Sequence, residues 1–203
     1  KDLLGIPWMV ALALRADGWY LRSDIIWAKP NPMPESVTDR PTKSHEHVFL
    51  FSKSPRYFYD ADAIAEPAIY AGTTGCVSGP KQASRAAARC AKPSGNEITG
   101  APRVAVADTR NARDVWTIAT QPFSGAHFAC MPQALAERCI LAGCPGGGTV
   151  LDPFAGAGTT GLVARKRRRI FVGIELNPAY ADMARKRISD AFPLYDLFEE
   201  PVS

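Results

Sequence analysis

Long apolar runs, paired cysteines and clustered histidines are all missing from this sequence, and each absence excludes a class of protein. No stretch of the 203 residues approaches the ~18 consecutive apolar residues that cross a bilayer. The first residues also lack the basic-then-apolar pattern of a signal peptide. The five cysteines contain no Cys-x-x-Cys pair, and the three histidines form no cluster at zinc spacing. We therefore expect a soluble, intracellular protein with reduced, inert thiols and no metal site.

The composition, with 46% hydrophobic and 22% charged residues, is that of a globular protein with one core or a core plus one insertion. The net charge of +4 is compatible with a polyanionic partner but does not identify one. The chain begins at Lys1 and almost at once enters a helix-like pattern. We therefore expect that an upstream segment is missing.

The first 59 residues predict a helix, a strand, a stiff loop and a hairpin. Apolar residues gather on one side of 3–14, where Pro7 fits only a first helical turn and Asp17-Gly18 supplies a stop. A strand is predicted over 20–27. Three alternating prolines make 29–35 an extended loop, hereafter the proline loop. The runs 47–51 and 57–59 flank five turn-forming residues, which predicts a hairpin.

Residues 60–114 are rich in Ala, Gly, Ser and Thr and predict an insertion without long elements. From residue 81 to residue 113, seven basic residues stand against two acidic ones; the basic residues are Lys81, Arg85, Arg89, Lys92, Arg103, Arg110 and Arg113. Two interpretations remain open. The surplus makes either a solvated loop or a surface that contacts phosphates.

The last part of the chain, 115–203, alternates strands and helices. Helices are predicted over 131–142 and 159–168 and strands over 149–152 and 170–175, and Asn177-Pro178 is a helix cap followed by proline at the first helical position. This alternation predicts a parallel sheet with right-handed crossovers, covered by helices, in an α/β fold.

The segment Asp152-Pro-Phe-Ala-Gly-Ala-Gly-Thr-Thr-Gly161 lies where a strand passes into a helix, which is the position of a nucleotide-binding turn. Glycines let a backbone approach a ligand, and the amides of a helix N-terminus point at it. Glu175 lies 19 residues after Gly156, at the tip of the next strand, where a carboxylate can accept both hydroxyls of a ribose. The pattern therefore predicts a site for one adenosine.

A nicotinamide dehydrogenase would carry a similar glycine pattern. Only 28 residues follow Glu175, however, which leaves no room for a second half and a substrate domain. Asp152 would also repel a pyrophosphate, whereas it would attract a sulfonium or an amino-acid ammonium. The oxidoreductase stays the weaker alternative, and it predicts binding of NADH.

The residues 152–160, followed by Gly173-Ile-Glu-Leu-Asn-Pro-Ala-Tyr180, resemble the S-adenosylmethionine site of DNA amino-methyltransferases, which modify adenine N6 or cytosine N4. The segments 18–35, 42–46 and 126–132 are similar to other parts of that family. The resemblance implies a Rossmann-like methyltransferase sheet, circularly permuted as in the family's beta class and partial at the N-terminus. It also implies S-adenosylmethionine as cofactor.

The resemblance further divides the chain into a base-pocket half (1–59), a basic insertion as candidate target-recognition region (60–114) and an S-adenosylmethionine-binding half (115–203). The cofactor contacts that it implies are His127, Phe128, Asp152, Phe154, Ala155, Gly156, Gly158, Thr159, Thr160, Glu175 and Asn177. The candidates for the base pocket or for DNA contacts are Lys29, Asn31, His45, Arg85 and Arg89. Lys29, Asn31 and His45 are equally compatible with structural roles.

The family's Asp/Asn/Ser-Pro-Pro-Tyr/Phe loop is not found, since these residues contain no Pro-Pro pair. That loop accepts hydrogen bonds from the target amine and stacks on the flipped base. We therefore expect a fragment of a site-specific DNA methyltransferase that binds cofactor but is inactive alone, with a slight preference for cytosine N4 over adenine N6. The alternatives are a non-catalytic DNA-binding remnant and a split-enzyme subunit.

The resemblance implies double-stranded DNA as partner, a bacterial or phage-encoded cytoplasmic protein, and a homodimer or a separate restriction enzyme as further partners to test. The basic run 165–169 has two interpretations. It resembles a nucleic-acid patch, but it also closes a helix, where cations favour the negative end of the dipole, and we favour this second interpretation.

Overall fold

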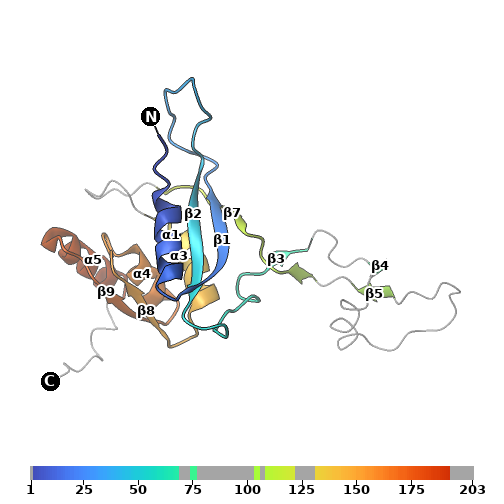
Figure 1. The fold of residues 1–203 in the computed structure, drawn as a ribbon. Helices are drawn as coiled ribbons and strands as arrows, with labels where there is room; N and C mark the ends of the chain where they lie inside the picture. Colours follow the sequence, from blue (N-terminus) through green and yellow to red (C-terminus); the bar gives the residue numbers. More distant parts are fainter. Residues whose placement is uncertain (1, 69–73, 77–102, 106–107, 122–130, 193–203) are drawn as a thin grey trace, which may run out of the picture. The chain divides into compact units, whose positions relative to one another are not determined.

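The structure is a computed structural model that describes residues 2–68, 74–76, 103–105, 108–121 and 131–192 (Figure 1). The chain divides into two compact units. Residues 64–112 form the smaller unit, and residues 1–63 with 113–203 form the larger one. All of the described helices belong to the larger unit.

The first half of the larger unit is a three-stranded sheet with one helix, α1 (Ile6–Ala16). Its strands are β1 (Tyr20–Ala28), β2 (His45–Ser52) and β7 (Val115–Thr117), in the order β2-β1-β7. The central strand β1 pairs antiparallel with β2 and parallel with β7. The predicted strand and helix are confirmed; Pro7 lies in the first helical turn, and Gly18 follows the helix with φ 97°.

The predicted hairpin is wrong, because residues 57–59 form no strand. Instead, β2 pairs with β1, which precedes it in the chain. After β2, the Ser52 hydroxyl donates to the Ser54 carbonyl (2.8 Å), and the Ser54 hydroxyl donates to the Arg56 carbonyl. The Asp60 amide then donates to the Ala142 carbonyl (2.9 Å). These local turns and this distant contact lead the chain away from β2.

The second half of the larger unit follows the predicted alternation. Its elements are α3 (Gln133–Gly143), β8 (Thr149–Asp152), α4 (Thr159–Lys166), β9 (Ile170–Gly173) and α5 (Pro178–Ala191). The strands β8 and β9 pair in parallel, from Thr149 opposite Ile170 to Asp152 opposite Gly173. The carboxyl ends of both strands therefore lie at one edge.

The core of this half lies between α3, α4 and one face of the β8–β9 pair. Ala136 and Ile140 of α3 pack against Val163 and Ala164 of α4. Val150 and Phe171 pack on this cluster from the strands. The alternate strand residues face the other way and are exposed: Leu151, Ile170 and Val172. Most of the apolar residues of α1 are also exposed, since only Ala11 of that helix is buried.

The smaller unit contains four short strands in its described part. The strand β3 (Glu66–Pro67) pairs antiparallel with β6 (Thr109–Arg110), and β4 (Thr74–Cys76) pairs antiparallel with β5 (Arg103–Ala105). The Arg110 side chain pairs with Glu66 at 3.5 Å. Four of the seven basic residues counted above, Lys81, Arg85, Arg89 and Lys92, lie outside the described residues. Within the described ranges, no helix is both long and apolar enough to cross a membrane.

Candidate functional site

Two carboxylates lie at the shared carboxyl edge of β8 and β9. Asp152 ends β8, and its Oδ1 accepts a hydrogen bond from the Phe154 amide (3.0 Å). Glu175 follows β9 by two residues. The backbones of the two connections are also joined, because Ile174 N–H donates to Asp152 O and Ala155 N–H donates to Ile174 O, both at 2.9 Å. The strand pairing therefore continues into the loop and brings the two predicted acids to one edge.

Glu175 holds the turn between β8 and α4 (residues 153–158, hereafter the glycine loop). Its Oε2 accepts from the Gly156 amide (2.8 Å), and its Oε1 accepts from the Asn177 amide (2.9 Å). Both oxygens of the carboxylate therefore accept a backbone amide, one on each side of the site. Asn177 in turn caps α5, because its Oδ1 accepts from the Ala179 amide (3.0 Å). One carboxylate thus connects the glycine loop to the start of α5.

Two glycines of the motif have packing reasons that the sequence did not indicate. Gly158 is the N-cap of α4 with φ 73°, and a Cβ there would lie 2.8 Å from the Cβ of Ala184 on α5. At Gly161 a Cβ would lie 2.5 Å from the Phe171 ring. The backbone of α4 therefore approaches α5 and β9 more closely than any side chain permits.

The threonines at the start of α4 differ in exposure. Thr159 is only 6% exposed, and its hydroxyl accepts from the Arg187 guanidinium of α5 at 3.1 Å, whereas Thr160 is half-buried. A helix leaves its first four amides without intrahelical partners. The Thr159 amide can therefore donate to a ligand, while its hydroxyl is used in the bond with Arg187.

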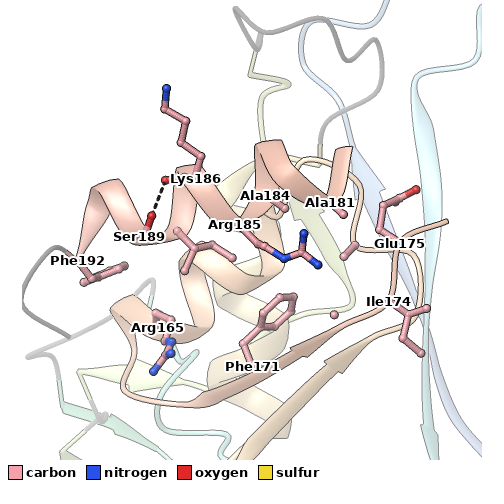
Figure 2. A pocket seen from close by; sticks show the side chains of 13 residues that line it. Arg165, Phe171, Ile174, Glu175, Ala181, Ala184, Arg185, Lys186, Ser189 and Phe192 are labelled. Carbon is pink, nitrogen blue, oxygen red and sulfur yellow. Dashed lines mark hydrogen bonds between the residues drawn. The ribbon is translucent and has the colours of Figure 1, made fainter. Parts of the chain in front are cut away.

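A cavity of about 740 Å³ lies between α5 and β9 (Figure 2). Glu175 and Ile174 line one end of it, and Phe192 and Arg165 lie toward the other. The cavity separates part of α5 from β9. Ala184, which also lines it, is where α5 closes onto the glycine loop.

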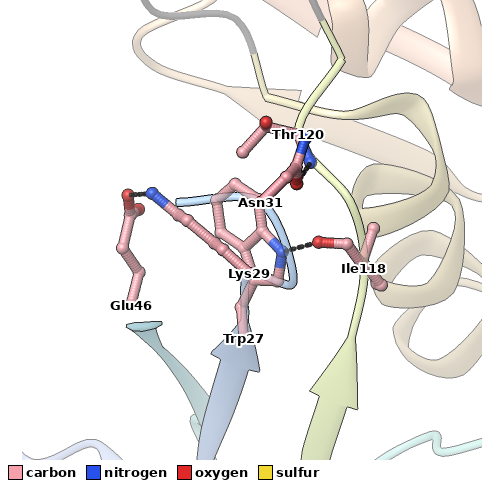
Figure 3. Close-up of polar contacts among 6 residues, drawn as sticks. All are labelled: Trp27, Lys29, Asn31, Glu46, Ile118 and Thr120. Carbon is pink, nitrogen blue, oxygen red and sulfur yellow. Dashed lines mark hydrogen bonds and ion pairs between the residues drawn. The ribbon is translucent and has the colours of Figure 1, made fainter. Parts of the chain in front are cut away.

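The proline loop is held by contacts across the insertion (Figure 3). The Trp27 indole donates to the Ile118 carbonyl (2.8 Å), and the Asn31 side-chain oxygen accepts from the Thr120 amide (3.0 Å). The Lys29 ammonium pairs with Glu46 and lies 4.6 Å from the centre of the Trp27 ring. Asn31 thus orders the loop through its side-chain oxygen, and Lys29 is held over an aromatic face.

Lys29 and His45 line one cavity of about 520 Å³, together with Glu35, Glu46 and Met33. Asn31 is not among its lining residues. The sequence therefore named two residues that the fold brings together, and it missed Glu46, whose partner Lys29 is 17 residues away. Trp27 was also missed, because its indole bond spans 91 residues.

Four predicted site residues, His127, Phe128, Arg85 and Arg89, lie outside the described residues. Phe154 is 87% exposed, beside the glycine loop, and Ala155 is buried within it. Arg187 was missed by sequence reasoning. The signal that could have found it is an arginine beside the small and apolar positions Ala184 and Ile188 of α5.

The basic run and the thiols fit structural roles. Arg167 pairs with Glu137, Lys166 donates to Gln133 (2.8 Å) and Arg169 donates to the Cys144 carbonyl (2.9 Å), so three of the five cations join α4 to α3. Cys139 and Cys144 are free thiols. Burial raises the pKa of Cys139 to about 11, which keeps it protonated near neutral pH. No group of three or more metal-ligating side chains occurs in the part of the chain that the structure describes.

The solved structures that superpose on this chain include proteins described as a DNA methyltransferase and a putative DNA modification methylase. The PvuII DNA methyltransferase, described as cytosine-N4-specific, superposes with a TM-score of 0.60 at 18% identity, covering 92% of this chain and 61% of that one. The M1.HpyAVI–SAM complex gives a TM-score of 0.55 at 22% identity, covering 92% and 71%. The predicted Rossmann-like methyltransferase class is therefore confirmed, and the circular permutation stays a prediction.

The family follows from the sequence itself. The family model N6_N4_Mtase, described as DNA methylase, matches residues 5–186, and the chain belongs to this family. It is 48% identical over 188 residues to the Type II methyltransferase M.SmaI of Serratia marcescens. The aligned residues make up 93% of this chain and 53% of that protein. The chain thus spans about half the length of the curated relatives it matches.

Proposed function

We propose that this chain supplies the S-adenosylmethionine site and part of the base pocket of a site-specific DNA methyltransferase. The observation that carries the proposal is the pair of carboxylates at the carboxyl edge of β8 and β9, one of which holds the glycine loop. The methyl acceptor is the exocyclic amine of cytosine or adenine in DNA, as in the family to which the chain belongs.

The residues present fit S-adenosylmethionine. Glu175 stands at the tip of β9 beside the glycine loop, where a carboxylate can meet the hydroxyls of a ribose, and Asp152 offers a negative charge for the ammonium of the methionine part. Phe154, Ile174 and Leu176 are exposed around this edge and offer apolar surface to a purine. The first-turn amides of Thr159 and Thr160 are the donors for the carboxylate of the ligand.

When bound, the cofactor would supply a methyl group on a positively charged sulfur: the amine nitrogen would bond to the methyl carbon as the carbon–sulfur bond breaks, the thioether would leave, and the amine would lose one proton. The chain's own residues bind and orient it. The cavity beside the proline loop is lined by the Lys29–Glu46 ion pair and by Glu35, which pairs with Arg40 at 2.8 Å; exchange of these partners would let the charged groups meet the edge of an extruded base. Both cytosine N4 and adenine N6 carry the amine donor that a carboxylate accepts, and we retain cytosine as the preferred target.

The test is calorimetric titration of the full chain with S-adenosylmethionine and, in competition, with NADH. Glu175→Ala and Asp152→Ala are each expected to weaken binding about 100-fold, since each removes charge-assisted bonds. The matched control is Asp182→Ala, a carboxylate on α5 that is 75% exposed. Binding of NADH instead would support the oxidoreductase, and DNA binding without any response to cofactor would support the remnant.

Equal affinity in both variants and the wild type would overturn the proposal. A second arm adds radiolabelled cofactor and duplex DNA to the gene product as it is made in its host. Methyl transfer to the amine of cytosine or adenine, read from the digested nucleosides, decides the target base.

A further inference from the structure

The last helix carries an arginine that no part of the proposed reaction uses. Arg187 lies on α5, half-buried, and its Nη1 donates to the Ala157 carbonyl and to the Thr159 hydroxyl, both at 3.1 Å. Both acceptors belong to buried residues, 3% and 6% exposed, at the junction of the glycine loop and α4. One nitrogen carries two hydrogens, so both bonds form together.

This position is unfavourable for a cation on general grounds. The N-terminus of a helix is the positive end of its dipole, and cations are stabilised at the other end. The start of α4 also has a glycine N-cap, no side-chain capping bond and no acidic residue in its first turn. An arginine there therefore needs a compensating contact, and the buried carbonyl and hydroxyl provide it.

Three residues of α5 contact the loop and the helix that follows it. Ala184 meets Gly158, Arg187 meets Ala157 and Thr159, and the side chain of Ile188 lies where a Cβ at Gly161 would be. Positions three and four apart share one helix face. Glu175 and Asn177 fix the start of the same helix, and Glu175 also holds the Gly156 amide. The glycine loop is therefore supported from both the first and the later part of α5.

We propose that Arg187 is a positioning residue for the cofactor: it fixes the Ala157–Gly158 peptide and the Thr159 side chain, and thereby aims the first amides of α4 at the ligand. The proposal rests on the proposed S-adenosylmethionine site. It assigns Arg187 no contact with cofactor or DNA. Its effect passes through the backbone of residues 157–160, whose placement decides how many amide bonds a ligand can make.

The experiment compares Arg187→Ala, Arg187→Lys and Arg185→Ala in the full chain. Arg185 is the matched control, because it lies on the same helix, is 77% exposed and pairs with Asp182. We expect about a 10-fold rise in the S-adenosylmethionine Kd for Arg187→Ala, a smaller rise for Arg187→Lys, and no change for Arg185→Ala. The free energy of unfolding is measured on the same samples with urea.

A second readout needs no cofactor. Hydrogen exchange at the amides of residues 156–161 is expected to quicken about 10-fold in Arg187→Ala and to stay unchanged in Arg185→Ala. A merely structural role would lower the free energy of unfolding while leaving both loop exchange and Kd as in the wild type. That result would overturn the proposal.

The two failures are distinguishable. If the wild-type chain binds no S-adenosylmethionine, the proposed function fails, and loop exchange still decides whether Arg187 positions the loop. If the wild type binds and Arg187→Ala binds equally well with unchanged exchange, only the positioning role fails. Recovery of affinity in Arg187→Lys beyond that of Arg187→Ala supports a donor at this position rather than side-chain volume alone.

Discussion

The glycine loop and the proline loop are held in different ways. The glycine loop is fixed by residues within about thirty positions of it, through Glu175 and Arg187. The proline loop and the end of β1 before it depend on residues that come after the whole insertion: Asn31 of the loop bonds to Thr120, 89 residues away, and Trp27 of β1 bonds to Ile118, 91 residues away. The first loop is encoded by one continuous segment, whereas the second forms only when both sides of the insertion have met.

This difference has a physical reason. The glycine loop needs close approach of backbones, which small residues give locally. The proline loop is already stiff, because alternating prolines restrict its backbone. Its conformation is therefore set locally, and distant bonds are needed only to fix its position. Loop-closure entropy must be overcome before its long-range anchors form. We therefore expect changes in the glycine loop to act through packing and changes at the proline loop to act through lost anchors.

The strongest test of this comparison is Gly158→Ala. The new Cβ would lie 2.8 Å from the Ala184 Cβ, and φ is 73°. Overpacking costs about 1–3 kcal/mol and the left-handed backbone about 1 kcal/mol more, so we expect a loss of about 2–4 kcal/mol. Urea denaturation measures the free energy of unfolding.

Gly147→Ala is the matched control for Gly158→Ala. Gly147 has nearly the same φ, 75°, but nothing lies within 4 Å of the position of its Cβ. It should therefore show only the backbone cost of about 1 kcal/mol. If both variants lose the same free energy of unfolding, the contact between α5 and the glycine loop contributes nothing to stability. The claim that changes in the glycine loop act through packing would then be wrong.

The second test removes the hydrogen bond that anchors the end of β1, just before the proline loop. Trp27 is 7% exposed, and Trp27→Phe deletes the donor to the Ile118 carbonyl. We expect a loss of about 1–2 kcal/mol, because an acceptor is left without its partner. The control is Trp19→Phe, whose half-buried ring contacts Lys53. Thermal unfolding followed by circular dichroism compares the two, and equal shifts of Tm would contradict the anchor.

The locally encoded half was also the more predictable one. The strand 149–152 was predicted with its observed limits, and the Asn177 cap followed from an Asn-Pro pair. The pairing of two carboxylates at one edge followed from strand–helix alternation alone. For the strand and the cap the signal lies within a few residues of the contact, and the two carboxylates lie within one strand–helix–strand unit.

The unpredicted features are those that depend on distant residues. The strand expected at 57–59 does not form, because the turns after β2 and the bond of Asp60 to Ala142 lead the chain away from β2. The roles of Arg187 and of Gly161 depend on where α5 and Phe171 lie, and the spacing of Arg187 from Ala184 and Ile188 indicates only the helix face that they share. Tertiary packing decides these features, and local propensity does not.

The third and smallest test uses α3, which contacts both halves. Asp60 bonds to its Ala142 carbonyl, Arg138 stacks 4.7 Å from the centre of the Trp116 ring of β7, and its buried face packs on α4. Burial raises the pKa of Cys139 on this helix from 9.0 to about 11. Because the folded state binds the thiol proton more tightly, stability is complete below about pH 9 and falls as the pH rises toward 11. By pH 9.5 the loss is about 1 kcal/mol, and Cys139→Ala should abolish that loss.

Two signals followed in this last test show whether the two halves that carry the loops unfold together. Tryptophan fluorescence reports on Trp27 and Trp116 in the first half, and hydrogen exchange of α4 amides reports on the second. If α3 joins the halves into one cooperative unit, the pH-dependent loss appears equally in both signals. If the pH-dependent loss appears only in the α4 amides, the β2-β1-β7 sheet unfolds separately from the second half. The bonds to Ile118 and Thr120 then stabilise that sheet and the proline loop alone.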